Sequence, residues 1–139
     1  MNNNQFVIFR LEEEFYGIKI DYVETIERMM PITRVPKAPN YVKGVINLRG
    51  EIVPIIDVRE RLNIEFKEYG SDTRIIVNKM KEMMIGYIVD SASEVKEIEP
   101  SMIDYATFDD TSSDTFVKGI GKIDDTMIII LDVDKIVEK

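Results

Sequence analysis

The chain has 139 residues, a length that suits one ordinary domain or two very small ones. Its 18 basic and 26 acidic residues give a net charge of −8, which argues against nucleic-acid binding, because a phosphate backbone needs a basic face, and favours basic or neutral protein partners. There is no cysteine and no histidine, so disulfides, thiolate zinc sites and the usual general base near pH 7 are excluded.

The first half of the chain predicts short strands separated by turn residues. β-Branched and aromatic residues predict strands over residues 5–11, 15–20, 44–48 and 51–56, and residues 21–28 suit either an irregular strand or one helical turn. The last two strands form a hairpin that turns at Arg49 and Gly50. Asp57 follows the hairpin and is placed to cap a short helix over residues 58–62.

The second half repeats this order. Strands are predicted over residues 74–80, 84–90, 94–98, 117–123 and 127–131. Asp132 then caps a short helix over residues 133–137. Short strands with Gly and Pro between them indicate an all-β barrel or sandwich, and five strands in about 60 residues is the size of a small barrel.

The two halves also match as a repeat. Three pairs of segments correspond, the first at an offset of 69 residues and the others at 75: 5–26 with 74–95, 43–45 with 118–120, and 54–58 with 129–133. We interpret them as two copies of one unit, about 5–66 and 74–138.

No membrane segment is visible in the sequence. The amino end lacks a basic region followed by an apolar stretch, so no signal peptide is predicted. The longest apolar run, residues 127–131, is far shorter than the roughly 20 residues of a membrane helix. We therefore expect a cytosolic protein that does not insert into a membrane.

Candidate chemistry is sparse. Asp57 and Asp132 could serve as the paired carboxylates of a hydrolase, although capping at two equivalent strand ends explains both. The side chain of Arg49 at the hairpin tip is either solvated or donates hydrogen bonds to carboxylate or carbonyl oxygens of a partner. Several methionines belong either to a core or to an adaptable binding surface: Met29, Met30, Met80, Met83 and Met84.

Five segments of the chain resemble CheW-like domains: residues 15–20, 36–50, 52–59, 86–90 and 118–121. The most specific is the Gly-Val-Ile-Asn-Leu-Arg-Gly run over residues 44–50. The resemblance covers nearly the whole chain and implies an all-β fold of two SH3-like five-stranded barrels with short helices. It implies one domain over 5–138, with subdomains of about 12–68 and 69–138, the N-terminal strand being a candidate member of the second.

The resemblance also implies a role without catalysis or cofactors. Family members are adaptors that couple methyl-accepting chemoreceptors to the histidine kinase CheA in bacterial chemotaxis arrays, at the inner face of the membrane. The implied partners are the regulatory domain of CheA and the helical tip of the receptor, with the adaptor a monomer in isolation. A CheW-like scaffold for another two-component kinase system, outside chemotaxis, is the alternative.

The resemblance assigns contact residues to positions of this chain. The implied receptor-binding residues are Ile20, Val23, Thr25, Ile26 and Arg49. The implied kinase-binding residues are Pro36, Lys37, Gly50 and Ile52. Thr25 departs from the family, since many members have Glu at that position, and this departure bears on receptor preference.

Overall fold

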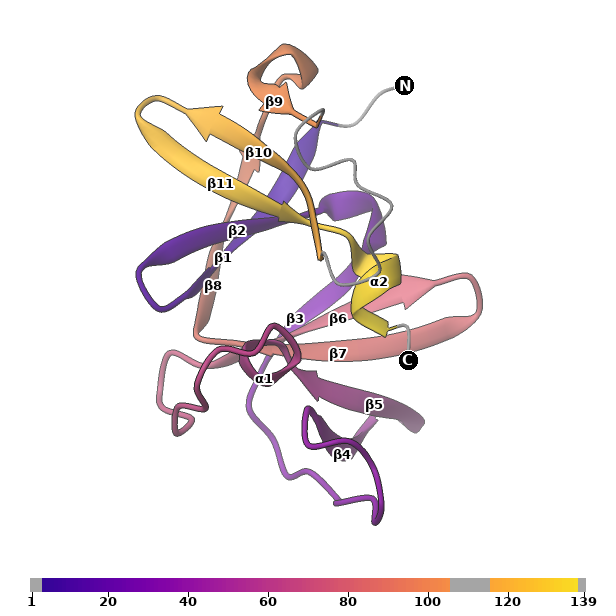
Figure 1. The fold of residues 1–139 in the computed structure, drawn as a ribbon. Helices are drawn as coiled ribbons and strands as arrows, with labels where there is room; N and C mark the ends of the chain where they lie inside the picture. Colours follow the sequence, from indigo (N-terminus) through magenta and orange to yellow (C-terminus); the bar gives the residue numbers. More distant parts are fainter. Residues whose placement is uncertain (1–3, 106–115, 138–139) are drawn as a thin grey trace. The chain divides into compact units, whose positions relative to one another are not determined.

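The computed structural model describes residues 4–105 and 116–137 and contains two β-sheets with a few short helices (Figure 1). The predicted all-β class is confirmed. Every predicted strand is present within two or three residues of its expected bounds, and the described residues add one two-residue strand that the sequence did not predict, β9 (Ile103–Asp104).

The first sheet has six strands in the order β8-β1-β2-β11-β10-β9. Their bounds are β1 Gln5–Leu11, β2 Glu14–Lys19, β8 Ser91–Glu97, β10 Val117–Ile123 and β11 Thr126–Leu131. A 3-10 turn over Ile20–Tyr22 follows β2, and another over Pro100–Met102 precedes β9. The helix α2 (Val133–Val137) has the bounds that the sequence predicted.

The second sheet has five strands in the order β3-β6-β7-β5-β4. Their bounds are β3 Val23–Arg28, β4 Val42–Leu48, β5 Glu51–Asp57, β6 Arg74–Met80 and β7 Met83–Val89. The helix α1 (Val58–Arg61) begins after the predicted cap Asp57, whose carboxylate accepts a hydrogen bond from the Glu60 backbone N–H at 3.4 Å.

The second sheet closes through the chain that follows β3. Thr33 and Val45 exchange two backbone hydrogen bonds, of 2.9 and 2.8 Å, which brings the segment after β3 against the edge strand β4. Gly44 makes this approach possible, because its φ is +138° and a side chain there would collide with the carbonyl oxygen of Thr33. The barrel closure therefore depends on a glycine of the Gly-Val-Ile-Asn-Leu-Arg-Gly run.

The chain forms two compact units that cross the predicted boundary. One is Tyr22–Ala92, and the other consists of the described parts of Met1–Asp21 and Ser93–Lys139. The subdomains of about 12–68 and 69–138 stay a prediction, and the compact units instead group the N-terminal strand β1 with the later strands β10 and β11. The reason is an exchange of hairpins: β2 pairs in parallel with β11, and β7 pairs in parallel with β5.

The strand register supports the repeat. Gly17 of β2 lies opposite Ile130, and Gly86 of β7 lies opposite Ile55, which are equivalent pairs under the two offsets. Both β4 and β10 carry an irregularity at equivalent places, between Val42 and Gly44 and between Val117 and Gly119. Sequence similarity between the halves thus corresponds to the same pairing geometry in each unit.

Each unit has its own apolar core. In Tyr22–Ala92 the core consists of Ile46, Leu48, Val53, Ile55, Ile75, Val77 and Ile88, and in the other unit of Phe6, Ile8, Ile98, Ile128 and Ile130. Met29, Met30 and Met84 pack against the first core, which confirms the core interpretation for these three. Met83 is exposed.

Candidate functional site

A β-bulge arranges the predicted receptor-binding residues of β3. Val23 pairs with Asn78 and Thr25 with Val77, so Glu24 is the extra residue. Cross-strand partners point to the same face of a sheet, so Val23 and Ile26 lie on the face of Asn78 and Ile76, which are themselves fully buried, and not on the face that joins the core cluster. Without the bulge, residues three positions apart would point to opposite faces. The bulge thus places the two apolar side chains together on the outer face of β3.

Thr25 and Arg49 belong to a different group. Thr25 lies on the other face of β3, where its hydroxyl donates a 2.8 Å hydrogen bond to Oε2 of Glu27. Arg49, at the tip of the β4–β5 hairpin, donates from Nη2 to the same oxygen at 3.2 Å while its side chain stays 70% exposed. Arg49 is therefore both solvated and tied to its own chain. Its partner Glu27 was not foreseen, although the strand period of two places it beside Thr25.

Ile20 lies in the other unit. It begins the 3-10 turn Ile20–Tyr22 and is half-buried. The predicted receptor-binding residues therefore come from two groups within Tyr22–Ala92 and one position outside it.

The predicted kinase-binding residues form two groups, both within Tyr22–Ala92. Gly50 and Ile52 lie at the β4–β5 hairpin, where the Gly50 N–H donates to Oδ1 of Asn47 at 2.9 Å. Ile52 is 65% exposed, an unusual state for isoleucine. Pro36 and Lys37 lie in the long connection between β3 and β4 and line a groove there.

Met127 is a candidate contact residue that the sequence reasoning missed. It is 61% exposed on β11 and corresponds to Ile52 at the repeat offset of 75 residues. Met102, Ile103 and Ile120 line a shallow hollow of about 500 Å³ together with it. The repeat itself was the signal: an exposed apolar residue in one hairpin predicts another at the equivalent position.

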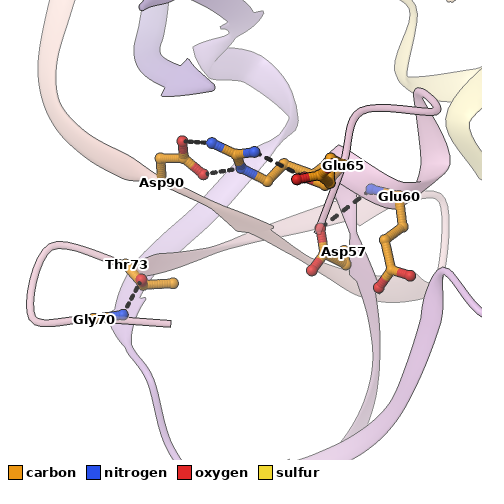
Figure 2. A network of polar contacts seen from close by, with 7 residues as sticks. Asp57, Glu60, Glu65, Gly70, Thr73 and Asp90 are labelled. Atoms are coloured by element: carbon orange, nitrogen blue, oxygen red, sulfur yellow. Dashed lines mark hydrogen bonds and ion pairs between the residues drawn. The ribbon is translucent and has the colours of Figure 1, made fainter. Parts of the chain in front are cut away.

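Arg59 forms the strongest polar network of Tyr22–Ala92. Its side chain, 4% exposed, donates from Nε and Nη2 to the two carboxylate oxygens of Asp90, at 2.7 and 2.6 Å. Nη1 also donates to the backbone carbonyl of Glu65 at 2.8 Å, and Figure 2 shows Glu65 and Asp90 on opposite sides of this guanidinium. Such a bidentate pair fixes geometry as well as charge. It connects α1, the end of β7 and the loop that follows α1.

A second polar group surrounds Asp57. The carboxylate is 1% exposed, and its Oδ2 accepts a 2.7 Å hydrogen bond from the Tyr69 hydroxyl. Burial raises the pKa of Asp57 above its usual 3.8, and this outweighs the hydrogen bonds from Tyr69 and the Glu60 backbone, which act in the opposite direction. Burial and the Asp57 hydrogen bond also raise the pKa of Tyr69. Figure 2 shows Asp57 facing the start of α1 at Glu60.

The raised pKa of Asp57 predicts a pH-dependent effect of Asp57→Asn. The folded state holds the proton more tightly than the unfolded chain, so the stability that this group contributes falls as pH rises from 3.8 through the folded-state pKa. Asparagine caps helices as well as aspartate and carries no charge. We expect Asp57→Asn to raise the melting temperature at neutral pH, with the gain shrinking as the pH is lowered toward 4 in thermal unfolding scans.

Asp132→Asn is the matched control, since Asp132 caps α2 but is only partly buried. A loss of stability in Asp57→Asn that is the same at every pH would contradict the prediction. It would mean that the ionised carboxylate is needed as an acceptor.

The paired-carboxylate hydrolase finds no support in this geometry. Asp57 and Asp132 belong to different units, and each accepts hydrogen bonds from the first turn of its own helix. Within residues 4–105 and 116–137 there is no cluster of three or more acidic side chains that could hold a metal ion. No helix in the same ranges is long and apolar enough to span a membrane.

The chain matches known proteins over nearly its whole length. The family model described as "CheW-like domain" matches residues 5–139. "Chemotaxis protein CheW" of Klebsiella aerogenes is 35% identical over 133 residues, covering 95% of this chain and 80% of that protein. The protein of the same name in Bacillus subtilis is 34% identical over 134 residues, covering 96% and 86%. The crystal structure of the scaffolding protein TtCheW from Thermoanaerobacter tengcongensis matches with a TM-score of 0.87 and 36% identity, over 100% of this chain and 90% of that one.

Proposed function

The chain belongs to the family of CheW-like domains, and on that premise we propose that it is a cytoplasmic adaptor that couples methyl-accepting chemoreceptors to the histidine kinase CheA. The adaptor makes and breaks no bond. Its work is to hold two partners in register within an array at the inner face of the membrane. The observation that carries the proposal is the coverage by chemotaxis proteins of the same family, together with exposed apolar positions in both units.

The outer face of β3 is the proposed receptor surface. Val23 and Ile26 are partly exposed and lie side by side because of the bulge at Glu24. Two apolar side chains on one face suit the apolar stripe of a helix, which is the form of the receptor tip. Arg49 at the hairpin tip supplies a planar cation to fix the register of that helix.

The proposed kinase surfaces are the hairpin tips of the two units. Ile52 and Met127 are exposed at equivalent positions of β5 and β11, so each unit presents one apolar side chain to a partner barrel. An adaptor with one such position in each unit can contact two kinase domains without forming its own dimer. We accordingly propose a monomer in isolation.

Service to another two-component kinase system is less favoured, because the relatives reported above carry chemotaxis names. The two systems differ in their partners, so a binding experiment separates them.

Co-sedimentation with CheA and a receptor cytoplasmic fragment tests the proposed function. We expect the wild-type chain in the pellet only when both partners are present. Val23→Asp should reduce the pelleted fraction at least about tenfold, because it places an unpaired carboxylate in an apolar contact. Val95→Asp, at an exposed position of β8, is the matched control and should leave the pellet unchanged.

Circular dichroism and urea unfolding establish that both variants are folded. If the folded wild-type chain stays in the supernatant at concentrations well above micromolar, the adaptor role for these partners is wrong, and another kinase system becomes the better hypothesis.

A further inference from the structure

A groove of about 680 Å³ lies in the unit Tyr22–Ala92. One side comes from the connection between β3 and β4, and the other from Phe66 and Tyr69 in the loop after α1. Its volume lies within the range of about 300–1,000 Å³ that ligand sites occupy.

The charge of this groove is opposite to that of the whole chain. Its charged lining residues are Arg34, Lys37 and Lys43, and no acidic side chain lines it. Lys43 forms an ion pair with Glu60. Among the described residues, neither Arg34 nor Lys37 has an ion-pair partner, and both are exposed. A protein with a net charge of −8 therefore has, among its described residues, two exposed cations without an ion-pair partner in the lining of one groove.

The aromatic wall of the groove is exposed and fixed. Phe66 and Tyr69 are 46% and 36% exposed, and their rings meet edge to face with centroids 5.4 Å apart. The Tyr69 hydroxyl is held by Asp57, and the Lys43 ammonium lies 5.1 Å from the centre of the Phe66 ring. Exposed rings that are already held in place lose little conformational entropy on binding a ligand.

The opposite wall is stiff. It contains Pro36 and Pro39, whose rings fix φ, with Lys37 between them at a φ of +63°. Grooves lined by aromatic rings and rigid backbone are typical binding sites for extended peptides, which present side chains without having to unfold.

We propose that this groove binds a short, extended, acidic peptide segment of a partner protein, with an apolar or proline side chain against Phe66 and Tyr69 and carboxylates at Arg34 and Lys37. The inference concerns the residues Pro36 and Lys37, for which the resemblance implies a kinase contact, and it rests on the proposed function only for the source of the peptide. An anionic membrane is the less favoured ligand, because its surface potential repels a chain with a net charge of −8. A short peptide, in contrast, interacts mainly with the basic side chains of the groove and not with the net charge of the whole chain.

Fluorescence anisotropy of the full chain with a labelled peptide of alternating glutamate, proline and leucine tests this inference. We expect binding that weakens as salt is added, and none with the same peptide carrying lysine for glutamate. Arg34→Glu combined with Lys37→Glu should weaken binding at least about tenfold. Lys19→Glu combined with Lys79→Glu reverses two exposed charges outside the groove and should leave affinity unchanged.

Phe66→Ala tests the aromatic wall and should also weaken binding, without removing the hydrogen bond between Tyr69 and Asp57. Equal binding of the acidic and basic peptides, no binding at millimolar acidic peptide, or charge reversals that act alike inside and outside the groove would overturn the inference. A different ligand would also overturn the inference. This would be shown if the chain bound no acidic peptide but sedimented with anionic phospholipid vesicles, and if Arg34→Glu combined with Lys37→Glu abolished that sedimentation.

The co-sedimentation experiment keeps the two proposals apart. If the chain pellets with kinase and receptor but ignores the acidic peptide, the groove inference fails and the adaptor function stands. If the acidic peptide binds but the chain does not pellet with kinase and receptor, the groove inference stands and the adaptor function fails.

Discussion

Replacing Arg59 by methionine should lower the free energy of unfolding by about 3–5 kcal/mol, the largest loss of stability that we expect from a single change to this chain. The guanidinium is buried, and it is the cation that compensates the Asp90 carboxylate. Methionine fills a similar volume but removes the cation and both guanidinium hydrogen bonds from that carboxylate, and it also removes the donor to the Glu65 carbonyl. Urea unfolding followed by circular dichroism measures the change.

The double variant Arg59→Met with Asp90→Leu distinguishes the loss of attraction from the cost of an isolated charge. Replacing both members of a buried pair by apolar residues is often neutral, so we expect most of the stability to return. If the double variant is no more stable than Arg59→Met, packing of the arginine stem rather than the charge pair accounts for the loss.

The pair of Arg59 and Asp90 should also affect peptide binding, because Arg59 holds the loop after α1. Arg59 binds the Glu65 carbonyl, and the next residues of that loop carry the aromatic wall of the groove. We therefore expect acidic-peptide affinity to fall in the double variant even where stability is recovered, because the loop loses its anchor to the barrel.

The strands and caps of this protein are predictable from sequence because their causes are local. Alternating β-branched residues set the strands, and Asp57 and Asp132 cap their helices as predicted. The repeat also relates strands that are distant in the sequence. Its offsets relate Gly17 to Gly86 and Ile55 to Ile130, and the structure pairs Gly17 with Ile130 and Gly86 with Ile55 in the same way. Close packing explains why residue 86 is a glycine, because a Cβ atom there would lie 2.6 Å from Cδ1 of Ile55.

The features that the sequence did not reveal depend on distant pairing. The exchange of the β1–β2 and β6–β7 hairpins between the two halves of the sequence leaves the strand pattern unchanged, so the pattern could not locate the compact units. The partner of Arg59 lies 31 residues away at Asp90, and an isolated arginine after a strand carries no sign of it. The net charge likewise gives no information about local groups of charge, and its implication for partners stays a prediction. It favoured basic or neutral partners, whereas the folded chain gathers Arg34 and Lys37 in a groove without acidic lining.

Arg49→Ala should reduce the fraction that co-sediments with CheA and receptor fragment at least about tenfold, while changing the free energy of unfolding by less than about 1 kcal/mol. Binding should fall without a large change in the free energy of unfolding because the Arg49 side chain is mostly exposed. Its ion pair with Glu27 contributes little to folding, whereas an arginine that becomes desolvated at an interface contributes much to binding. Arg49→Lys keeps the charge without the planar fork and should recover only part of the binding.

Glu27→Gln tests whether the intramolecular pair positions Arg49 for its partner. The carboxylate holds Nη2 of Arg49 at 3.2 Å and is itself held by the Thr25 hydroxyl, so Thr25, Glu27 and Arg49 form one connected group. Freeing the arginine costs about 0.5–1.5 kcal/mol of ordering on binding, which corresponds to a loss of affinity of roughly two- to tenfold. Glu94→Gln, which removes an exposed carboxylate on β8 in the other unit, is the control and should have no effect. If Glu27→Gln binds as tightly as the wild-type chain while Arg49→Ala does not, Arg49 contacts the partner without preorganisation. If neither variant loses binding, Arg49 is a solvated hairpin residue, and the receptor surface consists of the apolar face of β3 alone.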